Sequence, residues 1–293
     1  MLPNLTRFST GLPWLDESLG GGLLPGSLTM VIGATGVGKT QLGIHFGEAG
    51  RATEGHRAAI LDLSSRGDSQ NHAGYTSQLF GTQLTTIDPR SETLVDPFKH
   101  GRPADVLPFF GYSGRRVLRS QLDVDEWHAW QSELNRRLPL LSRFVYGHLI
   151  HGTRRFLVDG IEPQAAPEDS LQLDLLESVY HRMLRIEHDW LAREVFRQHF
   201  RQLEPQVMRS SYDHNASSAV VLVTTRQSIL EQLMTQPLAA GDLAACANTV
   251  ILMGRTLTGG KMARGLYIAK HRGSFADDRI LKFDIDDKGL KAM

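Results

Sequence analysis

The chemically most informative stretch of the chain is glycine-rich and follows an apolar run at 28–32. It fits the phosphate-binding pattern G-x-x-x-x-G-K-[ST] with the residues Gly33-Ala34-Thr35-Gly36-Val37-Gly38-Lys39-Thr40. Glycines in such a loop let backbone N–H groups turn toward phosphate oxygens, and a helix beginning near Lys39 adds the positive end of its dipole. The stretch therefore predicts a binding site for a nucleoside triphosphate.

The side chains that end this stretch have separate expected roles. Lys39 should reach the β- and γ-phosphates, and the Thr40 hydroxyl should coordinate Mg²⁺. An ordinary glycine-rich turn is the alternative, and an apolar strand before the loop with a helix after it argues against that. The residues expected to touch the nucleotide are Gly33, Ala34, Thr35, Gly36, Val37, Gly38, Lys39, Thr40 and Gln41.

A second nucleotide signal is an apolar strand that ends in an acid, Arg154-Arg155-Phe156-Leu157-Val158-Asp159. This is the Walker B arrangement, in which an aspartate at the carboxyl end of a buried strand holds Mg²⁺ or its water. Such an aspartate is otherwise a turn or helix cap. With the glycine-rich loop upstream, we expect Lys39 and Asp159 to be catalytic groups, Thr40 and Asp159 to be metal ligands, and ATP with Mg²⁺ to be the cofactors. No base-reading motif separates ATP from GTP.

Composition is that of a globular protein of 293 residues whose formal net charge is zero. A neutral chain has no broad electrostatic attraction to nucleic acid or to a membrane. The single cysteine, Cys246, cannot form an internal disulfide, and no apolar run approaches the ~20 residues that span a bilayer. These features predict a cytoplasmic protein without a membrane segment.

Apolar runs alternate with helical patterns at 40–50, 125–150 and 170–208, which predicts a doubly wound, mostly parallel α/β sheet. The last runs have little helix between them, and Gly259-Gly260 marks a turn, so antiparallel strands should form the C-terminal edge. We expect one domain over 1–293, with a lead-in at 1–27 and an irregular insertion at 65–123. The predicted strands are 28–32, 58–63, 156–158, 219–223, 250–253, 266–269 and 280–285.

Both ends of the chain resemble one family. The segment at 9–27, which contains Thr10-Gly11, Leu15-Asp16 and Leu19-Gly20-Gly21-Gly22-Leu23, resembles the "T-G-x-x-x-L-D-x-x-L-G-G-G-L-x-x-G" lead-in of the RecA/KaiC superfamily of ATPases. Near the other end, Lys270-His271-Arg272-Gly273-Ser274 resembles the "K-x-R-G-S" segment of KaiC-like domains. The resemblance covers about 5–64 and 154–285 without the long helical segment, and it implies a sheet of the RecA-like P-loop type.

In this family ATP lies between subunits, and cations from the neighbour touch the γ-phosphate. The resemblance therefore implies a homo-oligomeric ring or filament, or assembly with a related ATPase subunit, in which Lys270 and Arg272 are catalytic in trans. A pair of solvated edge-strand charges is the alternative. Thr225 or Gln227 matches the family's sensor strand, although a threonine that ends a strand is as often a local cap.

One departure from the family concerns hydrolysis. The family places one or two glutamates after the second strand to polarise the attacking water, whereas this chain has Ser64 and Ser65 there. A serine without a partner is a poor general base. Substitutes for the missing glutamate would be Asp62, Asp68 or Glu162. We therefore expect nucleotide binding with slow or absent hydrolysis, as in an assembly or signalling switch.

Partner and rival functions stay open at this stage. The helical stripe at 164–209 would serve as a protein-docking face or as core. Gly114–Arg119 interleaves arginines with flanking aromatics, as single-strand binders do, so a DNA-stimulated recombinase-type ATPase is the rival function. A subunit that binds nucleotide only to stay folded is the third reading. The flanking aromatics are Phe109, Phe110, Tyr112, Trp127 and Trp130.

Overall fold

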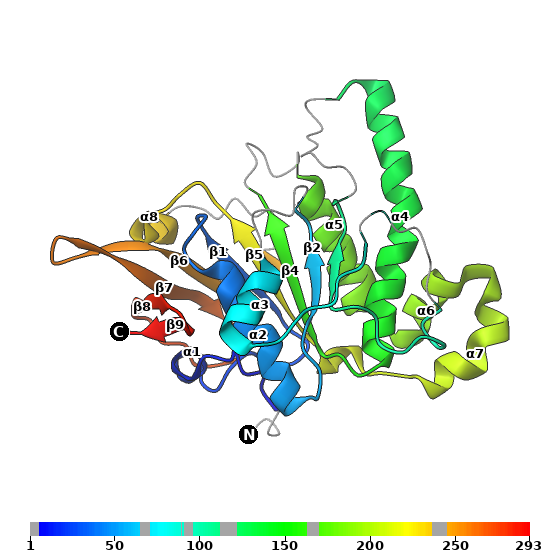
Figure 1. Cartoon of the computed structure of the whole chain (residues 1–293), viewed down its shortest axis with the longest axis horizontal. Helices are drawn as coiled ribbons and strands as arrows, with labels where there is room; N and C mark the ends of the chain where they lie inside the picture. The colour runs from blue at the N-terminus through cyan, green and yellow to red at the C-terminus, as the bar shows by residue number, and fades with distance from the viewer. Residues whose placement is uncertain are drawn as a thin grey trace.

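The computed structural model describes residues 6–64, 71–88, 90, 96–111, 122–162, 170–235 and 245–293. These residues form an α/β fold around one nine-stranded mixed sheet, with strand order β3-β2-β4-β5-β1-β6-β7-β8-β9 (Figure 1). Within this part of the chain no helix combines the length and apolar character needed to cross a membrane.

Parallel strands make up the centre of the sheet. β1 lies between β5 and β6 and runs parallel to both, while β2 lies between β3 and β4 and runs parallel to both. Near-continuous apolar sequence explains this position, because strands covered on both faces need apolar side chains pointing both ways. These strands are β1 (Leu28–Gly33), β2 (Ala59–Asp62), β3 (Val106–Pro108), β4 (Arg155–Ile161) and β5 (Ser218–Thr224).

The C-terminal strands are antiparallel to one another, as the sequence predicts. The first two form a long hairpin whose turn residues, Gly259 and Gly260, have φ angles of +55° and +77°. Glycine adopts these left-handed angles without a Cβ penalty, which explains why two glycines stand at this turn. The strands are β6 (Thr249–Thr258), β7 (Lys261–His271), β8 (Leu281–Asp286) and β9 (Gly289–Ala292).

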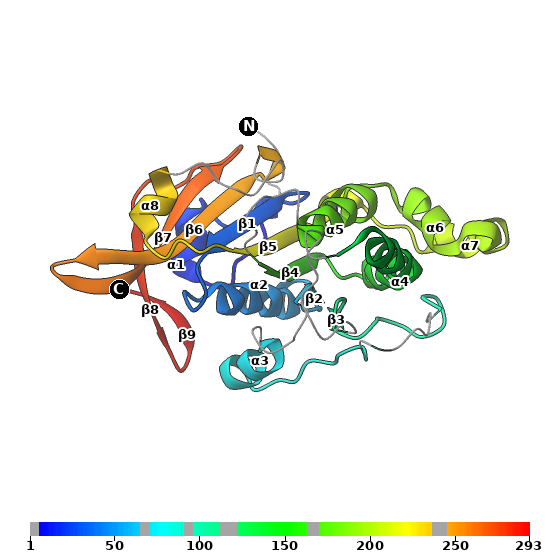
Figure 2. The same ribbon diagram turned by 90° about the horizontal axis from the view of Figure 1, so that it is seen from above.

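Helices cover both faces of the sheet and bury a separate core on each. Side chains alternate between the faces along a strand, so Met30 lies in one core and Val31 in the other. The Met30 core contains residues of α4 (Val124–Ile150) and α5 (Leu171–Val179). The Val31 core contains residues of α1 (Pro13–Ser18) and α2 (Lys39–Thr53), and Figure 2 shows α2 and α3 (His72–Phe80) on one side of the central strands.

The structure differs from the sequence-based expectation in two regions. The stretch 65–123, expected to be irregular, contains α3 and β3 among its described residues. The pattern at 170–208 is a broken series instead of one helix, partly because Arg197 has a left-handed φ of +46°. That series is α5, the π-helix η3 (Tyr180–Leu184), α6 (His188–Phe196), the 3₁₀ turn η4 (Arg197–His199) and α7 (Phe200–Arg209), and farther along the chain lie η5 (His214–Ala216) and α8 (Leu230–Thr235).

Most of the helical stripe in that series is core. Leu175, Val179, Phe196 and Phe200 are all buried, whereas Trp190 is 58% exposed. Packing of α5 on the sheet and of α6 on α4 and α7 therefore accounts for the buried residues of the stripe, and of these five side chains only Trp190 is exposed enough to support a docking face.

Candidate nucleotide-binding site

The glycine-rich loop lies at the carboxyl end of β1, in the middle of the sheet. Gly33 ends β1 and α2 begins at Lys39, with Gly38 as its N-cap at a φ of +106°. A Cβ on Gly33 would lie 2.3 Å from the Met253 carbonyl oxygen of β6, so only glycine fits there. The strand, loop and helix expected from the sequence are present, and ligands of open α/β sheets bind at this edge.

A pocket of about 580 Å³ opens over this loop. Gln41 lines it, and the Gln41 Oε1 is buried without a hydrogen-bond partner. An unsatisfied buried acceptor costs free energy, so a donor from a ligand or water would be favoured here. Gly33 and Val37, expected to contact a nucleotide, are not among the lining residues, because Gly33 belongs to β1 and Val37 is buried in the core. The lining residues are Ala34, Thr35, Gly36, Gly38, Lys39, Thr40, Gln41, Tyr75, Asp159, Glu162, Thr224, Thr225 and Arg226.

Lys39 lies at the base of this pocket with its amine held by the loop. Its Nζ donates a hydrogen bond to the Ala34 carbonyl at 2.9 Å, and the residue is only 7% exposed. Burial lowers the pKa of Lys39 to about 8, with Asp159 acting in the opposite direction. The amine is therefore mostly protonated at neutral pH, and a phosphate group would supply the anion that it lacks.

Asp159, on β4, is brought to α2 across the sheet. Its Oδ2 accepts a hydrogen bond from the Thr40 hydroxyl at 2.9 Å, so both predicted metal ligands meet. The Oδ1 accepts from the Gly160 N–H at 2.7 Å, which fixes the carboxylate plane. Hydroxyl and carboxylate oxygens are the donor type that suits Mg²⁺, so the residues present beside the glycine-rich loop would fit a magnesium nucleotide.

His72 contacts a predicted site residue and was missed by sequence reasoning. The imidazole, on the first residue of α3, lies with its Nε2 3.1 Å from Asp159 Oδ2, and His72 is 4% exposed. Its helix also places Tyr75 in the pocket lining. No local pattern connects residues 87 positions apart, and α3 lies in a stretch without clear periodicity.

Asp62 and Glu162, two of the acidic residues considered for hydrolysis, have different surroundings. Asp62 is buried, and its Oδ1 accepts from the Ser64 N–H at 2.8 Å. Burial raises the pKa of Asp62, while nearby His72 and hydrogen bonds from Ser64 lower it. Ser64 itself is buried, whereas Glu162 lines the pocket. Ser65 and Asp68 lie outside the described residues.

The end of β5 supplies the remaining wall of the pocket. Thr225, one of the two predicted sensor residues, lines the pocket and its backbone N–H donates to the Gly33 carbonyl at 3.1 Å. Gln227, the other, is not among the lining residues. Arg226 lines the pocket and was missed, although a cation directly after a buried strand was a signal that the sequence offered.

Lys270 and Arg272 do not reach this pocket within one chain. His271 is level with Thr249, which is level with Thr29 near the start of β1. At ~3.3 Å per residue, the loop after Gly33 is on the order of 15 Å farther along the strand direction. The Lys270 Nζ donates to the Ala245 carbonyl at 2.9 Å. The two cations thus lie near the end of the strands opposite the loop.

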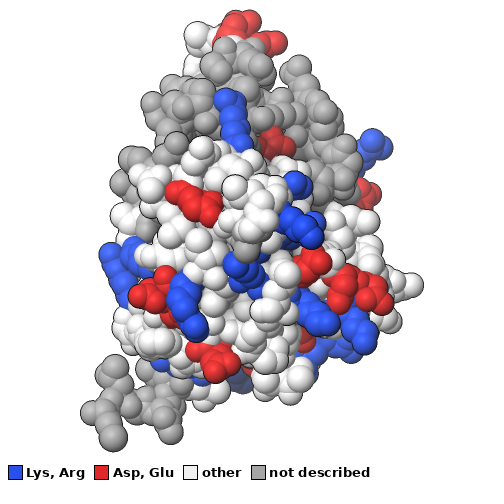
Figure 3. Space-filling model, turned by 90° about the vertical axis from the view of Figure 1, so that its left-hand side faces the viewer, with Lys and Arg blue, Asp and Glu red and all other residues white. Residues whose placement is uncertain are grey.

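The residues suggested for nucleic-acid binding have little free aromatic surface where they are described. Phe109 and Phe110 are buried, and Trp130 stacks on Trp127 with ring centroids 5.7 Å apart. Gly114–Arg119 and Tyr112 lie outside the described residues. Among the described residues on the face drawn in Figure 3, positive and negative side chains are intermingled and form no extended basic surface.

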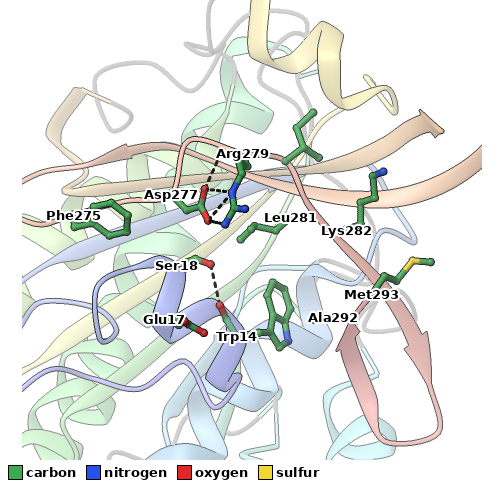
Figure 4. A pocket seen from close by; sticks show the side chains of 11 residues that line it. Trp14, Glu17, Ser18, Phe275, Asp277, Arg279, Leu281, Lys282, Ala292 and Met293 are labelled. Carbon is green, nitrogen blue, oxygen red and sulfur yellow. Dashed lines mark hydrogen bonds and ion pairs between the residues drawn. The ribbon is translucent and has the colours of Figure 1, made fainter.

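A second hollow, of about 510 Å³, lies between α1 and the strands at the C-terminal edge (Figure 4). Asp277 and Arg279 in its wall pair with each other at 2.7 Å, and the Ser18 hydroxyl donates to the Trp14 carbonyl. Its wall thus lacks the loop, the buried lysine and the carboxylate that converge on the first pocket.

Two searches, one for metal-binding groups of side chains and one for related proteins, also concern this site. Among the described residues there is no group of three or more histidine, cysteine, aspartate or glutamate side chains that could hold a metal ion. No protein-family model matches the chain, and a search of curated proteins finds no match.

Proposed function

We propose that this chain binds Mg-ATP in the pocket over 33–41 and acts as a nucleotide-dependent assembly or signalling switch of the RecA/KaiC-like P-loop type. The observation that carries the proposal is that one loop and three side chains meet in one pocket. They are the loop after β1, Lys39 and Thr40 on α2, and Asp159 on β4. Backbone N–H groups, a cation and a magnesium-type donor set are what a nucleoside triphosphate with Mg²⁺ requires.

Slow hydrolysis is the second part of the proposal. Ser64, at one of the two positions where the family places a glutamate, is buried, and its backbone N–H and hydroxyl both hydrogen-bond to Asp62. Asp62 is buried, accepts a hydrogen bond from the Ser64 N–H and is not among the residues that line the pocket, so its carboxylate does not face a water there. Glu162 is the remaining described carboxylate among the candidates, and it is the residue to test if turnover is observed.

The location of Lys270 and Arg272 supports an oligomeric switch. Both cations lie at the end of the strands opposite the loop, so they do not reach the pocket of their own chain. In an oligomer they would be able to contact a nucleotide bound to a neighbouring subunit. A triphosphate held by both subunits would strengthen such a contact, and loss of the γ-phosphate would weaken it.

The test is ATP binding and steady-state hydrolysis on one purified sample, with wild type beside Lys39→Ala and Ser65→Glu. Micromolar binding that Lys39→Ala abolishes, with negligible turnover that Ser65→Glu increases, would support both parts of the proposal. Brisk wild-type turnover lost in Glu162→Gln would overturn the slow-hydrolysis part. Turnover stimulated by single-stranded DNA in a salt-sensitive way would favour the recombinase reading instead. Absence of nucleotide binding would overturn the proposal altogether.

A further inference from the structure

One carboxylate oxygen of Asp159, Oδ2, has two side-chain partners. The Thr40 Oγ1 lies 2.9 Å from Asp159 Oδ2, and the His72 Nε2 lies 3.1 Å from the same oxygen. The three atoms come from α2, α3 and β4; Thr40 and Asp159 line the pocket, and His72 lies behind Asp159, one helical turn before the pocket-lining Tyr75. A magnesium site of oxygen ligands alone has no need of the imidazole.

These separations are those of adjacent ligands on a six-coordinate metal ion. With metal–ligand bonds of ~2.1 Å, octahedral geometry puts neighbouring ligand atoms about 3.0 Å apart. The observed distances of 2.9 and 3.1 Å bracket that value. A metal ion bound to Asp159 Oδ2 would therefore have the Thr40 Oγ1 and the His72 Nε2 each at the separation of a neighbouring ligand.

The location of His72 on its helix is held by local contacts. The Asn71 side chain caps α3 by accepting from the Gly74 N–H at 2.9 Å, and Phe80 at the far end contacts the His45 ring on α2 at 5.2 Å. With 4% exposure, the imidazole has little freedom to turn into solvent. The ring nitrogen is thus preorganised beside Asp159.

We propose that His72 is a nitrogen ligand of the divalent metal ion that binds with the nucleotide, so that the site favours Mn²⁺ or Co²⁺ over Mg²⁺. This inference rests on the proposed nucleotide binding. Imidazole is a good ligand for first-row transition metals, whereas Mg²⁺ prefers oxygen. Coordination through Nε2 requires the proton that this atom now donates to Asp159 to move to Nδ1 or to solvent.

The small number of protein ligands adds a requirement. One histidine, one carboxylate and one hydroxyl leave three positions of an octahedron for phosphate oxygens and water. The metal should therefore bind weakly alone and tightly together with the nucleotide. The competing explanation is structural: the His72 N–H only fastens α3 to β4 through Asp159.

Pulsed EPR of the wild-type protein with Mn²⁺ and the non-hydrolysable analogue AMP-PNP separates these explanations. A histidine ligand gives a ¹⁴N coupling to Mn²⁺, and growth on ¹⁵N-histidine replaces it with a ¹⁵N coupling. Absence of nitrogen coupling while Mn²⁺ and AMP-PNP are bound would overturn the inference and leave the proposed function standing. Failure of AMP-PNP to bind with any of the three metals would overturn both. This measurement needs no variant, so a folding defect cannot obscure it.

A comparison of Co²⁺ and Mg²⁺ affinities provides a second test of the proposal. In His72→Gln, the affinity for Co²⁺ in the presence of AMP-PNP should fall about tenfold or more, while the Mg²⁺ affinity should change by less than about threefold. His45→Gln is the matched control, because His45 contacts α3 through Phe80 without reaching Asp159. An unchanged ratio of Co²⁺ to Mg²⁺ affinity in folded His72→Gln would contradict a ligand role.

Discussion

Asp62 on β2 and Asp159 on β4 lie directly side by side in the parallel register of the sheet. Both residues are buried, and the Asp159 charge adds to burial in raising the pKa of Asp62. The floor of the candidate site therefore carries two neighbouring carboxyl groups, of which Asp159 alone borders the pocket. Two neighbouring carboxylates repel each other, and this repulsion disfavours the charged form of Asp62.

Replacing Asp62 by asparagine should raise the thermal midpoint of the unliganded protein at pH 7. The amide keeps an oxygen that accepts from the Ser64 N–H and removes the buried negative charge. A carboxyl group whose folded-state pKa is raised stabilises the fold below its unfolded pKa, and this contribution is lost as pH rises through the folded pKa. The advantage of Asp62→Asn should therefore shrink on acidification toward pH 4. Thermal melts across this range check it, and a lower midpoint at pH 7 would contradict it.

Nucleotide affinity should decrease as pH rises through about 8. The Lys39 pKa lies near that value in the unliganded protein, and an anionic phosphate group requires the protonated amine. Above this pH, binding takes up a proton, and the loss should approach tenfold per pH unit. Isothermal titration between pH 7 and 9.5 measures the slope. Lys39→Arg is charged throughout this range and should give a flat profile, so a flat profile for wild type would count against the role of Lys39.

Arg155 should be among the most sensitive residues of the fold. Its guanidinium is 1% exposed, pairs with Glu54 at 2.8 Å and donates to the Phe46 carbonyl at 2.8 Å. Arg155→Ala would leave the buried Phe46 carbonyl without this donor and the partly exposed Glu54 carboxylate without its partner, and it should lower the free energy of unfolding by ~3–5 kcal/mol. Urea unfolding provides the measurement. Arg136→Ala, which breaks an exposed pair on α4, should cost less than ~1 kcal/mol, and equal losses in the two variants would refute the prediction.

Lys270→Ala and Arg272→Ala should weaken nucleotide-dependent assembly while leaving nucleotide binding by one chain intact. Both residues lie near the end of the strands opposite the loop, so their contribution requires a neighbour. Sedimentation velocity with Mg-AMP-PNP and with Mg-ADP should show a larger wild-type assembly with the triphosphate analogue, and the variants should lose that difference. Variants that assemble like wild type would remove the case for cations acting in trans.

The central strands and the loop were accessible from sequence because their signals are local. Each predicted apolar run overlaps a strand, and the Gly259-Gly260 turn joins β6 to β7. β3 and β9 were missed since three or four residues carry too little periodicity, and β3 ends in a proline. His72 was missed for another reason: its partner Asp159 is distant in sequence, and only the fold brings α3 against β4.

The interruption of the helix predicted at 170–208 shows a different limit of prediction from sequence. Its apolar positions do recur at helical spacing, and most of the described ones are buried, so the pattern reports the buried face correctly. Continuity is decided elsewhere, by backbone geometry such as the left-handed Arg197 and by packing of α6 on α4. Hydrophobic period therefore predicts which side chains face the core, but it does not predict where a helix is interrupted.

The position of β1 has a consequence for synthesis on the ribosome. This strand is made early, yet its two neighbours are β5, which starts at Ser218, and β6, which starts at Thr249. At about 5–20 residues per second, both edges of an apolar strand stay unpaired for on the order of 10–40 s. The nascent chain must therefore be shielded by early packing of α2 or by a chaperone, and this protein should be prone to aggregate when its translation is truncated before β6.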